Sequence, residues 1–242
     1  MLNQATINQL HELKLFGMLD AFEQSIQQNE HQSIGFADGI GLLVDHEMIY
    51  RKNKKHKGLL NKAKLRYPKA CFEDLKAQTS RQYPKDKLNG LITTQWLENH
   101  ENVVLSGPTG VGKTYFACAI AQQACRNGYS AKYFRLSKLL EMLRIARSDG
   151  TYLQFLARIA KIKCLIIDDW GLEELSDERR VDLLEIFDDR YKINSTIITT
   201  QLPIEHWHDF IGEPTIADAI VDRIINNAIM IDIEGDTLRR SD

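Results

Sequence analysis

Long apolar runs are missing from this sequence. A membrane-spanning helix needs about 18 or more consecutive apolar residues, and no stretch of the 242-residue chain approaches that length. The first residues, Met-Leu-Asn-Gln-Ala-Thr, also lack the basic start and the apolar core of a secretory signal peptide. We therefore expect a cytoplasmic protein that does not bind a membrane.

Cysteine is scarce as well. The chain has four cysteines, none of them in a C-x-x-C pair, and Cys118 and Cys164 fall within apolar segments. Closely spaced cysteine pairs are the usual sign of a structural metal site or a redox-active dithiol. We expect buried, free thiols in a reducing compartment instead.

Acidic residues are absent from residues 51–69, although the whole chain carries a formal net charge of only -2. The cations of this segment that we expect to contact DNA are Arg51, Lys52, Lys54, Lys55, Lys57, Lys62, Lys64 and Arg66. Such a run binds nucleic acid because phosphate contacts release condensed counterions. The alternative is a solvated helix face without a ligand.

The segments around this basic run predict a small helical domain. Apolar residues recur at helical spacing over residues 4–28, interrupted at Gly17, and again from Phe36 onward. Turn signals within residues 71–92 indicate a connector. We therefore expect a DNA- and partner-binding domain over residues 1–78 and a second domain over residues 79–242.

A glycine-rich motif, G-x-x-x-x-G-K-[ST], defines the second domain. It consists of Gly107, Pro108, Thr109, Gly110, Val111, Gly112, Lys113 and Thr114. An apolar run predicts a strand before it, over residues 102–106, and the spacing predicts a helix after it, over residues 115–126. The backbone N–H groups of such a loop surround a polyphosphate. Lys113 would reach the β- and γ-phosphates, and the Thr114 hydroxyl would ligate Mg²⁺.

Two aspartates end a second strand, which is predicted over residues 163–169 and contains an apolar run. Asp168 would hold Mg²⁺, and Asp169 would polarise the attacking water. Another buried strand, over residues 195–203, ends in polar residues that include Thr200 and Gln201. Because the carboxyl ends of parallel strands meet at one edge of a sheet, we expect both residues beside the aspartates. Gln201 could there sense the γ-phosphate and position water.

The remaining pattern alternates strands and helices. Strands are predicted over residues 131–135 and 228–233, and the intervening segments have helical spacing, with Ser137 and Ser176 as helix caps. This alternation predicts a three-layer α/β P-loop NTPase with a parallel sheet and without a sizeable C-terminal lid. The chain lacks the [NT]KxD motif that reads guanine, so we expect ATP and Mg²⁺ as cofactors.

The order of these motifs resembles the AAA+ class and, within it, the IstB-type helper ATPases of bacterial insertion sequences, relatives of the DnaC helicase loaders. The resemblance lies in Leu13–Leu19, Gly107–Thr114, Leu165–Gly171, Thr199–His208 and Pro214–Arg223. It implies a homo-oligomer that assembles on duplex DNA with ATP sites shared between subunits and helps a partner transposase select its target. It also implies that Arg223 is an arginine finger acting on ATP held by a neighbouring subunit.

Three other functions fit parts of the sequence. A DnaC-like helicase loader would share the ATPase core and differ in its N-terminal helices. A non-hydrolysing DNA scaffold would use ATP only as a ligand, and the intact set of Lys113, Thr114, Asp168 and Asp169 argues against it. A small-molecule kinase would need an acceptor-binding lid, for which the sequence offers no obvious segment.

Overall fold

The computed structural model describes residues 2–27, 35–77 and 85–235, and the chain divides into two compact units, residues 1–58 and 59–242. The turn signals at residues 83–84 lie outside the described residues. Among the described helices, none combines the length and the apolar character that a bilayer crossing requires. All four thiols are free, and those of Cys118, Cys125 and Cys164 are buried.

The first unit consists of helices. They are α1 (Leu2–Glu12), α2 (Phe16–Gln27) and most of α3 (Phe36–Ala63). The helical pattern predicted over residues 4–28 is divided as expected, but the break precedes Gly17: Lys14 takes a left-handed backbone angle, φ 58°, and Gly17 lies in the first turn of α2.

A buried carboxylate fixes the start of α2 against α3. Glu47 of α3 is 5% exposed, and its Oε2 accepts hydrogen bonds from the backbone N–H groups of Gly17, at 2.7 Å, and Met18, at 3.2 Å. Burial acts to raise the pKa of Glu47, but hydrogen bonds from Arg51 and these two N–H groups bring it below its ordinary value. A carboxylate at this position satisfies N–H groups that a helix start leaves unpaired and interacts favourably with the helix dipole.

The second unit contains a parallel sheet and its covering helices. In chain order its elements are α4 (Phe72–Ala77), α5 (Lys85–Thr93), α6 (Gln95–Glu98), β1 (Asn102–Ser106), α7 (Lys113–Arg126), β2 (Ala131–Arg135), α8 (Leu136–Ser148), α9 (Tyr152–Ala160), β3 (Cys164–Trp170), α10 (Asp177–Arg190), β4 (Ser195–Thr200), the 3₁₀ helix η2 (Ile204–His206), α11 (Trp207–Ile211), α12 (Pro214–Ile225) and β5 (Ala228–Asp232). The three-layer P-loop fold predicted from the sequence is confirmed.

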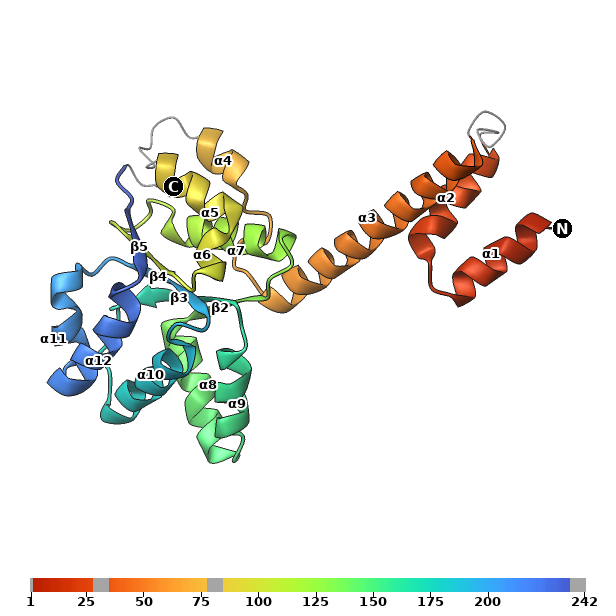
Figure 1. The fold of residues 1–242 in the computed structure, drawn as a ribbon. Helices are drawn as coiled ribbons and strands as arrows, with labels where there is room; N and C mark the ends of the chain where they lie inside the picture. Colours follow the sequence, from red (N-terminus) through yellow and green to blue (C-terminus); the bar gives the residue numbers. More distant parts are fainter. Residues whose placement is uncertain (1, 28–34, 78–84, 236–242) are drawn as a thin grey trace, which may run out of the picture. The chain divides into compact units, whose positions relative to one another are not determined.

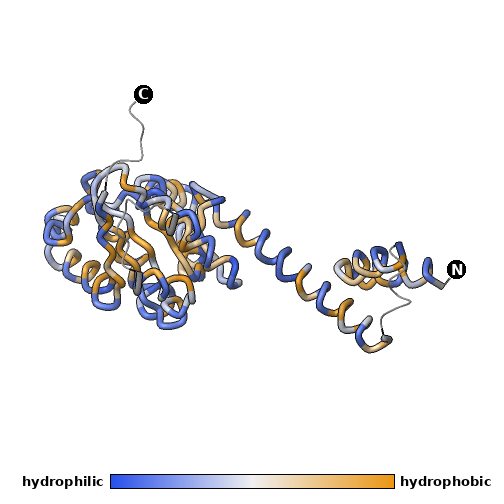
Figure 2. Tube along the Cα trace, turned by 90° about the horizontal axis from the view of Figure 1, so that it is seen from above, coloured by the Kyte–Doolittle hydropathy of each residue, from blue (hydrophilic) through white to orange (hydrophobic). Residues whose placement is uncertain are grey.

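The five strands are parallel, in the order β2-β3-β4-β1-β5. Helices α4 to α7 cover one face of the sheet and helices α8 to α12 the other (Figure 1). Hydrophobic residues follow the strands through the middle of this unit (Figure 2), and every residue of β4 is buried. Because both faces are covered, β1 and the first part of β3 read as continuous apolar runs rather than as alternating ones.

Two details differ from the expectations. Residues 71–92, expected as a connector, contain α4 and α5, and Phe72 packs edge-on against Phe116 of α7, with ring centroids 6.1 Å apart. Ser137 is not a helix cap, since α8 begins at Leu136 with Arg135 at the capping position. The predicted cap at Ser176 is confirmed, because its side chain accepts a hydrogen bond from the Arg179 N–H.

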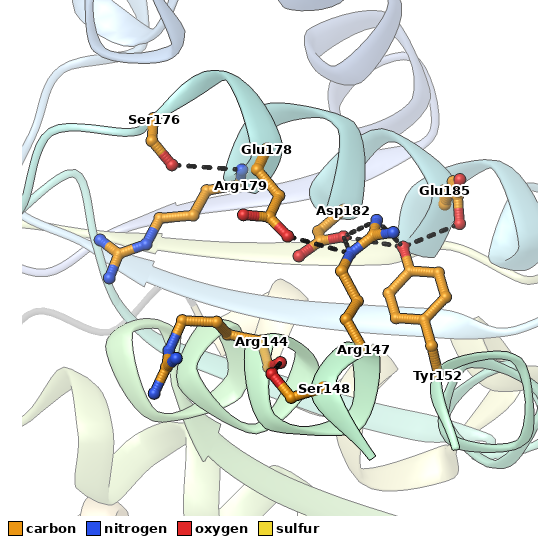
Figure 3. Close-up of polar contacts among 9 residues, drawn as sticks. All are labelled: Arg144, Arg147, Ser148, Tyr152, Ser176, Glu178, Arg179, Asp182 and Glu185. Carbon is orange, nitrogen blue, oxygen red and sulfur yellow. Dashed lines mark hydrogen bonds and ion pairs between the residues drawn. The ribbon is translucent and has the colours of Figure 1, made fainter. Parts of the chain in front are cut away.

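A polar network ties α8, α9 and α10 together at the periphery (Figure 3). Asp182 of α10 is 2% exposed and pairs with Arg147 of α8, while the Tyr152 hydroxyl of α9 lies 2.7 Å from the same carboxylate. The Arg147 guanidinium also lies over the Tyr152 ring, 3.7 Å from its centroid. This network holds together the helices of one face without reaching the strand ends.

The close packing of α2 on α3 predicts the effect of one substitution. A Cβ at Gly17 would lie 2.6 Å from the His46 carbonyl oxygen and 2.7 Å from the Glu47 Cα. Because both are backbone atoms, the helices would have to separate, and Gly17→Ala should destabilise the first unit by about 1–3 kcal/mol. Hydrogen exchange of the α1 and α2 amides would measure this loss.

Gly41→Ala is the matched control. Gly41 lies inside α3, and a Cβ there would meet nothing within 4 Å. Alanine is favoured over glycine in a helix by about 0.5–1 kcal/mol, so this variant should be neutral or slightly stabilising. Equal protection in both variants would contradict the proposed role of Gly17.

Candidate nucleotide-binding site

The phosphate loop lies between the end of β1 and the start of α7. Three of its glycines have positive φ angles: 137° at Gly107, 88° at Gly110 and 96° at Gly112. Residues that have a Cβ atom rarely adopt such backbone angles. At Gly107 there is also no room, since a Cβ would lie 2.3 Å from the Ile233 carbonyl oxygen. The loop therefore turns tightly and leads directly into the N-terminus of α7, where helix N–H groups attract anions.

Lys113 is the first residue of α7 and lies under the loop. Its side chain is nearly buried, and Nζ donates hydrogen bonds of 2.7 Å to the carbonyl oxygens of both Gly107 and Pro108. A cavity of about 280 Å³ opens beside it. The lining includes Tyr67, Thr109, Gly110, Gly112, Lys113, Thr114, Tyr115, Asp169, Thr199 and Gln201. The structure thus gathers most of the predicted phosphate-binding residues around one cavity.

Asp168, at the carboxyl end of β3, is completely buried. Its carboxylate accepts hydrogen bonds from the hydroxyls of Thr114, at 2.9 Å, Tyr133, at 2.6 Å, and Thr199. The Arg66 guanidinium lies 4.0 Å from its Oδ2 atom. The side chains of Thr114 and Asp168 supply the hard oxygen donors that Mg²⁺ prefers, so these residues fit the ion.

Asp169 occupies the edge of the cavity and has a left-handed backbone angle, φ 64°. Arg135, the last residue of β2, pairs with its carboxylate at 3.2 Å. Burial raises the pKa of Asp169, and repulsion by Asp168 adds to this, whereas Arg135, Arg66 and Lys113 act in the opposite direction. A carboxylate with a raised pKa that faces a cavity has the character of a proton acceptor.

The polar end of β4 lies against both the aspartates and the loop. Gln201 contacts the Thr109 hydroxyl, so the residue predicted to sense phosphate does lie at the loop. Thr200 also lines the cavity, but its hydroxyl bonds to the Trp170 and Leu202 carbonyls. Thr199 instead contacts Asp168, a role that the sequence did not identify.

Arg223, the predicted finger, lies far from this cavity in its own chain. The Asn102 side chain donates to its carbonyl oxygen at 3.1 Å, and Asn102 is the first residue of β1, whereas the phosphate loop follows the last. The strand separates the two by roughly 13 Å at ~3.3 Å per residue. The guanidinium pairs with Asp188, at 2.7 and 2.8 Å.

The predicted DNA-contacting residues are exposed, but they differ in their contacts. Arg51 pairs with Glu47 at 2.6 Å, and the Lys54 ammonium lies 5.5 Å from the centre of the Phe16 ring. The Arg66 guanidinium lies 4.0 Å from the Asp168 carboxylate. The side chains of Lys52, Lys55, Lys57, Lys62 and Lys64 are exposed.

Sheet order, phosphate loop and paired aspartates together define a P-loop nucleotide-binding protein with an AAA+ fold. The crystal structure of the DnaC helicase loader has a similar fold: the TM-score is 0.54 at 24% identity, over 62% of this chain and 89% of that one. This likeness concerns the fold alone.

The chain belongs to the family of IstB-like ATP binding proteins, whose profile matches residues 8–242. It is 42% identical over 241 residues to an insertion sequence ATP-binding protein (y4pL) of Sinorhizobium fredii, covering 100% of this chain and 98% of the relative. It is 46% identical over 203 residues to the ATP-binding protein of insertion sequence IS1162 from Pseudomonas fluorescens, covering 84% and 88%.

The position of Lys113 predicts its contribution to ATP binding. Lys113→Ala removes the cation nearest to the loop, and a hydrogen bond to a charged group contributes about 1.5–3 kcal/mol. The dissociation constant for ATP should therefore rise by about 10- to 100-fold, measured by calorimetry with Mg²⁺. Lys161→Ala, at an exposed lysine after α9, should leave it unchanged. Equal affinities in the two variants would contradict this role.

Proposed function

We propose that this protein is an ATPase that assembles on duplex DNA as a homo-oligomer and helps a partner transposase select its target. The observation that carries the proposal is the pair of aspartates beside the phosphate loop. Asp168 is fully buried and accepts a hydrogen bond from the Thr114 hydroxyl, whereas Asp169 lines the cavity. The names of the relatives, which are insertion sequence proteins, support the link to transposition.

The two carboxylates have different surroundings, which supports different roles. Asp168, held by three hydroxyls, is fixed in place and would hold Mg²⁺ together with Thr114. When bound, Mg²⁺ neutralises charge that develops on the phosphate oxygens. Asp169 has its carboxylate at the cavity edge and would polarise the attacking water. Gln201, at the loop, would help to position that water.

Sharing of ATP sites between subunits is supported by the place of Arg223. Its backbone lies at the opposite end of β1 from the phosphate loop, and its guanidinium pairs with Asp188 rather than with a residue of the cavity. An arginine supplied by a neighbour typically increases the rate of phosphoryl transfer by about 10³–10⁵-fold. We therefore assign Arg223 to the site of the next subunit in the assembly.

Mixing two inactive variants tests this assignment. Arg223→Ala and Asp169→Asn should each bind ATP and hydrolyse it poorly. In a mixed assembly, an intact Arg223 from one subunit can meet an intact Asp169 site in its neighbour. The ATPase activity of the mixture should therefore recover in part and rise with protein concentration.

The control for mixing is co-assembly, followed by pull-down of differently tagged variants with ATP and DNA. Asp188→Asn is a second control, since it removes the negative charge that pairs with Arg223 in the isolated chain and leaves the arginine in place. A mixture that co-assembles and stays inactive would contradict the role of Arg223 between subunits.

Binding to DNA is supported by the cations of α3. Lys52, Lys55 and Lys62 are exposed and lie at helical positions i, i+3 and i+10, which fall on one face. At 1.5 Å per residue they extend over about 15 Å of the helix. A duplex carries a negative charge about every 1.7 Å of its axis, so a stripe of this length meets several phosphates.

Charge reversal tests the role of these cations in DNA binding. Replacing Lys52, Lys55 and Lys62 by Glu should weaken binding to duplexes of any sequence. It should also lower the log–log salt dependence by roughly 0.9 for each phosphate that the variant no longer neutralises, as measured by fluorescence anisotropy over a salt series.

The matched control reverses three exposed lysines of the second unit, at Lys138, Lys161 and Lys163. It changes the net charge by the same amount, so any effect that it shares with the α3 variant reflects net charge alone. If both triple variants bind DNA with the same affinity and slope, the cations of α3 are a solvated face.

A further inference from the structure

The segment between α3 and α4 is packed tightly beside the nucleotide site. Leu65 and Ala70 are buried in the core of the second unit. Between them, the backbone of Arg66 and Tyr67 passes close enough to the buried Cys118 thiol of α7 to lower the pKa of that thiol against the effect of burial. The Tyr67 ring packs against Tyr115, with centroids 5.7 Å apart, and Tyr67 lines the cavity. The packing on both sides therefore fixes the place of Arg66.

Arg66 reaches Asp168 from this segment. Its guanidinium lies 4.0 Å from Oδ2 of Asp168, and the Tyr133 hydroxyl donates a hydrogen bond of 2.6 Å to the same oxygen. Arg66 thus lies beside the buried Asp168, and the next residue in the chain, Tyr67, lines the cavity of the phosphate loop.

Arg66 is not the main partner of the Asp168 carboxylate. The Asp168 carboxylate already accepts hydrogen bonds from three hydroxyls, those of Thr114, Tyr133 and Thr199. The Arg66 side chain is 36% exposed, and its distance of 4.0 Å from the Asp168 carboxylate is at the outer limit for an ion pair. A guanidinium matches phosphate oxygens better, because its planar fork can donate two parallel hydrogen bonds.

We propose that Arg66 contacts the terminal phosphate of ATP within its own subunit and so distinguishes ATP from ADP. This inference depends on the nucleotide occupying the phosphate loop, as in the proposed function. It gives Arg66 a role separate from that of Arg223, which acts on the neighbour's nucleotide. It also removes Arg66 from the residues that contact DNA.

Nucleotide affinity tests the proposal without hydrolysis. The dissociation constants of ADP and of a non-hydrolysable ATP analogue, AMPPNP, are measured by calorimetry with Mg²⁺ for wild type, Arg66→Gln and Arg66→Lys. Removal of a charge-assisted hydrogen bond predicts that Arg66→Gln weakens AMPPNP binding by about 10- to 100-fold. ADP binding should change by less than about threefold, and Arg66→Lys should weaken AMPPNP binding less than Arg66→Gln.

Arg126→Gln is the matched control. This exposed arginine lies at the far end of α7 and pairs only loosely with Glu73, at 3.8 Å. It should leave both affinities at the wild-type values, and the thermal unfolding of all variants checks that they are folded. If Arg66→Gln is not folded, Arg66→Lys, which keeps the charge, still tests the selective loss of AMPPNP affinity.

Two results would overturn the inference while leaving the proposed function intact. One is an equal loss of AMPPNP and ADP affinity, which would mean that Arg66 only orients Asp168. The other is no loss of either. A wild-type protein that binds neither nucleotide would instead overturn the proposed function together with this inference.

Discussion

The complete burial of one carboxylate, that of Asp168, is the constraint on which the rest of the site depends. Removing a charge from water costs several kcal/mol unless hydrogen bonds and opposite charges compensate. Here the compensation comes from Thr114 on α7, Tyr133 on β2 and Thr199 on β4, with Arg66 nearby. Since each partner belongs to a different element, the phosphate-loop helix and three neighbouring strands must all be in register for the carboxylate to be satisfied.

Local sequence patterns predicted the parts of this site that are continuous in the chain. The phosphate loop and the aspartates each follow a short apolar run, and both were placed correctly at strand ends. Tyr133 and Thr199 could not be found in this way, because their contacts depend on β2 and β4 lying on either side of β3. A register shift between Ile167 and Trp170 adds to the difficulty.

Composition could not distinguish Arg66 from its neighbours for a similar reason. It is one of many cations in residues 51–69, and a count of charges does not show which of them contact other parts of the protein. The structure separates it from the others, because α3 ends at Ala63 and Lys64 takes a left-handed backbone angle, φ 51°. The chain then leaves the helix direction, and the packing of Leu65 directs the next residue towards the sheet.

An arginine that serves a neighbouring subunit must be released from its own chain at little cost. In the isolated chain Arg223 pairs with Asp188, whose side chain is 61% exposed. Exposed ion pairs contribute about 0.2–1 kcal/mol. The Arg223 side chain is 26% exposed and also donates to the Ala219 carbonyl oxygen at 2.9 Å, and a hydrogen bond of a charged group contributes about 1.5–3 kcal/mol. A 10³–10⁵-fold rate increase from a finger corresponds to about 4–7 kcal/mol of transition-state stabilisation. In an assembly, Arg223 would therefore favour the neighbour's phosphate over Asp188. Before assembly, the ion pair with Asp188 would keep the arginine side chain ordered.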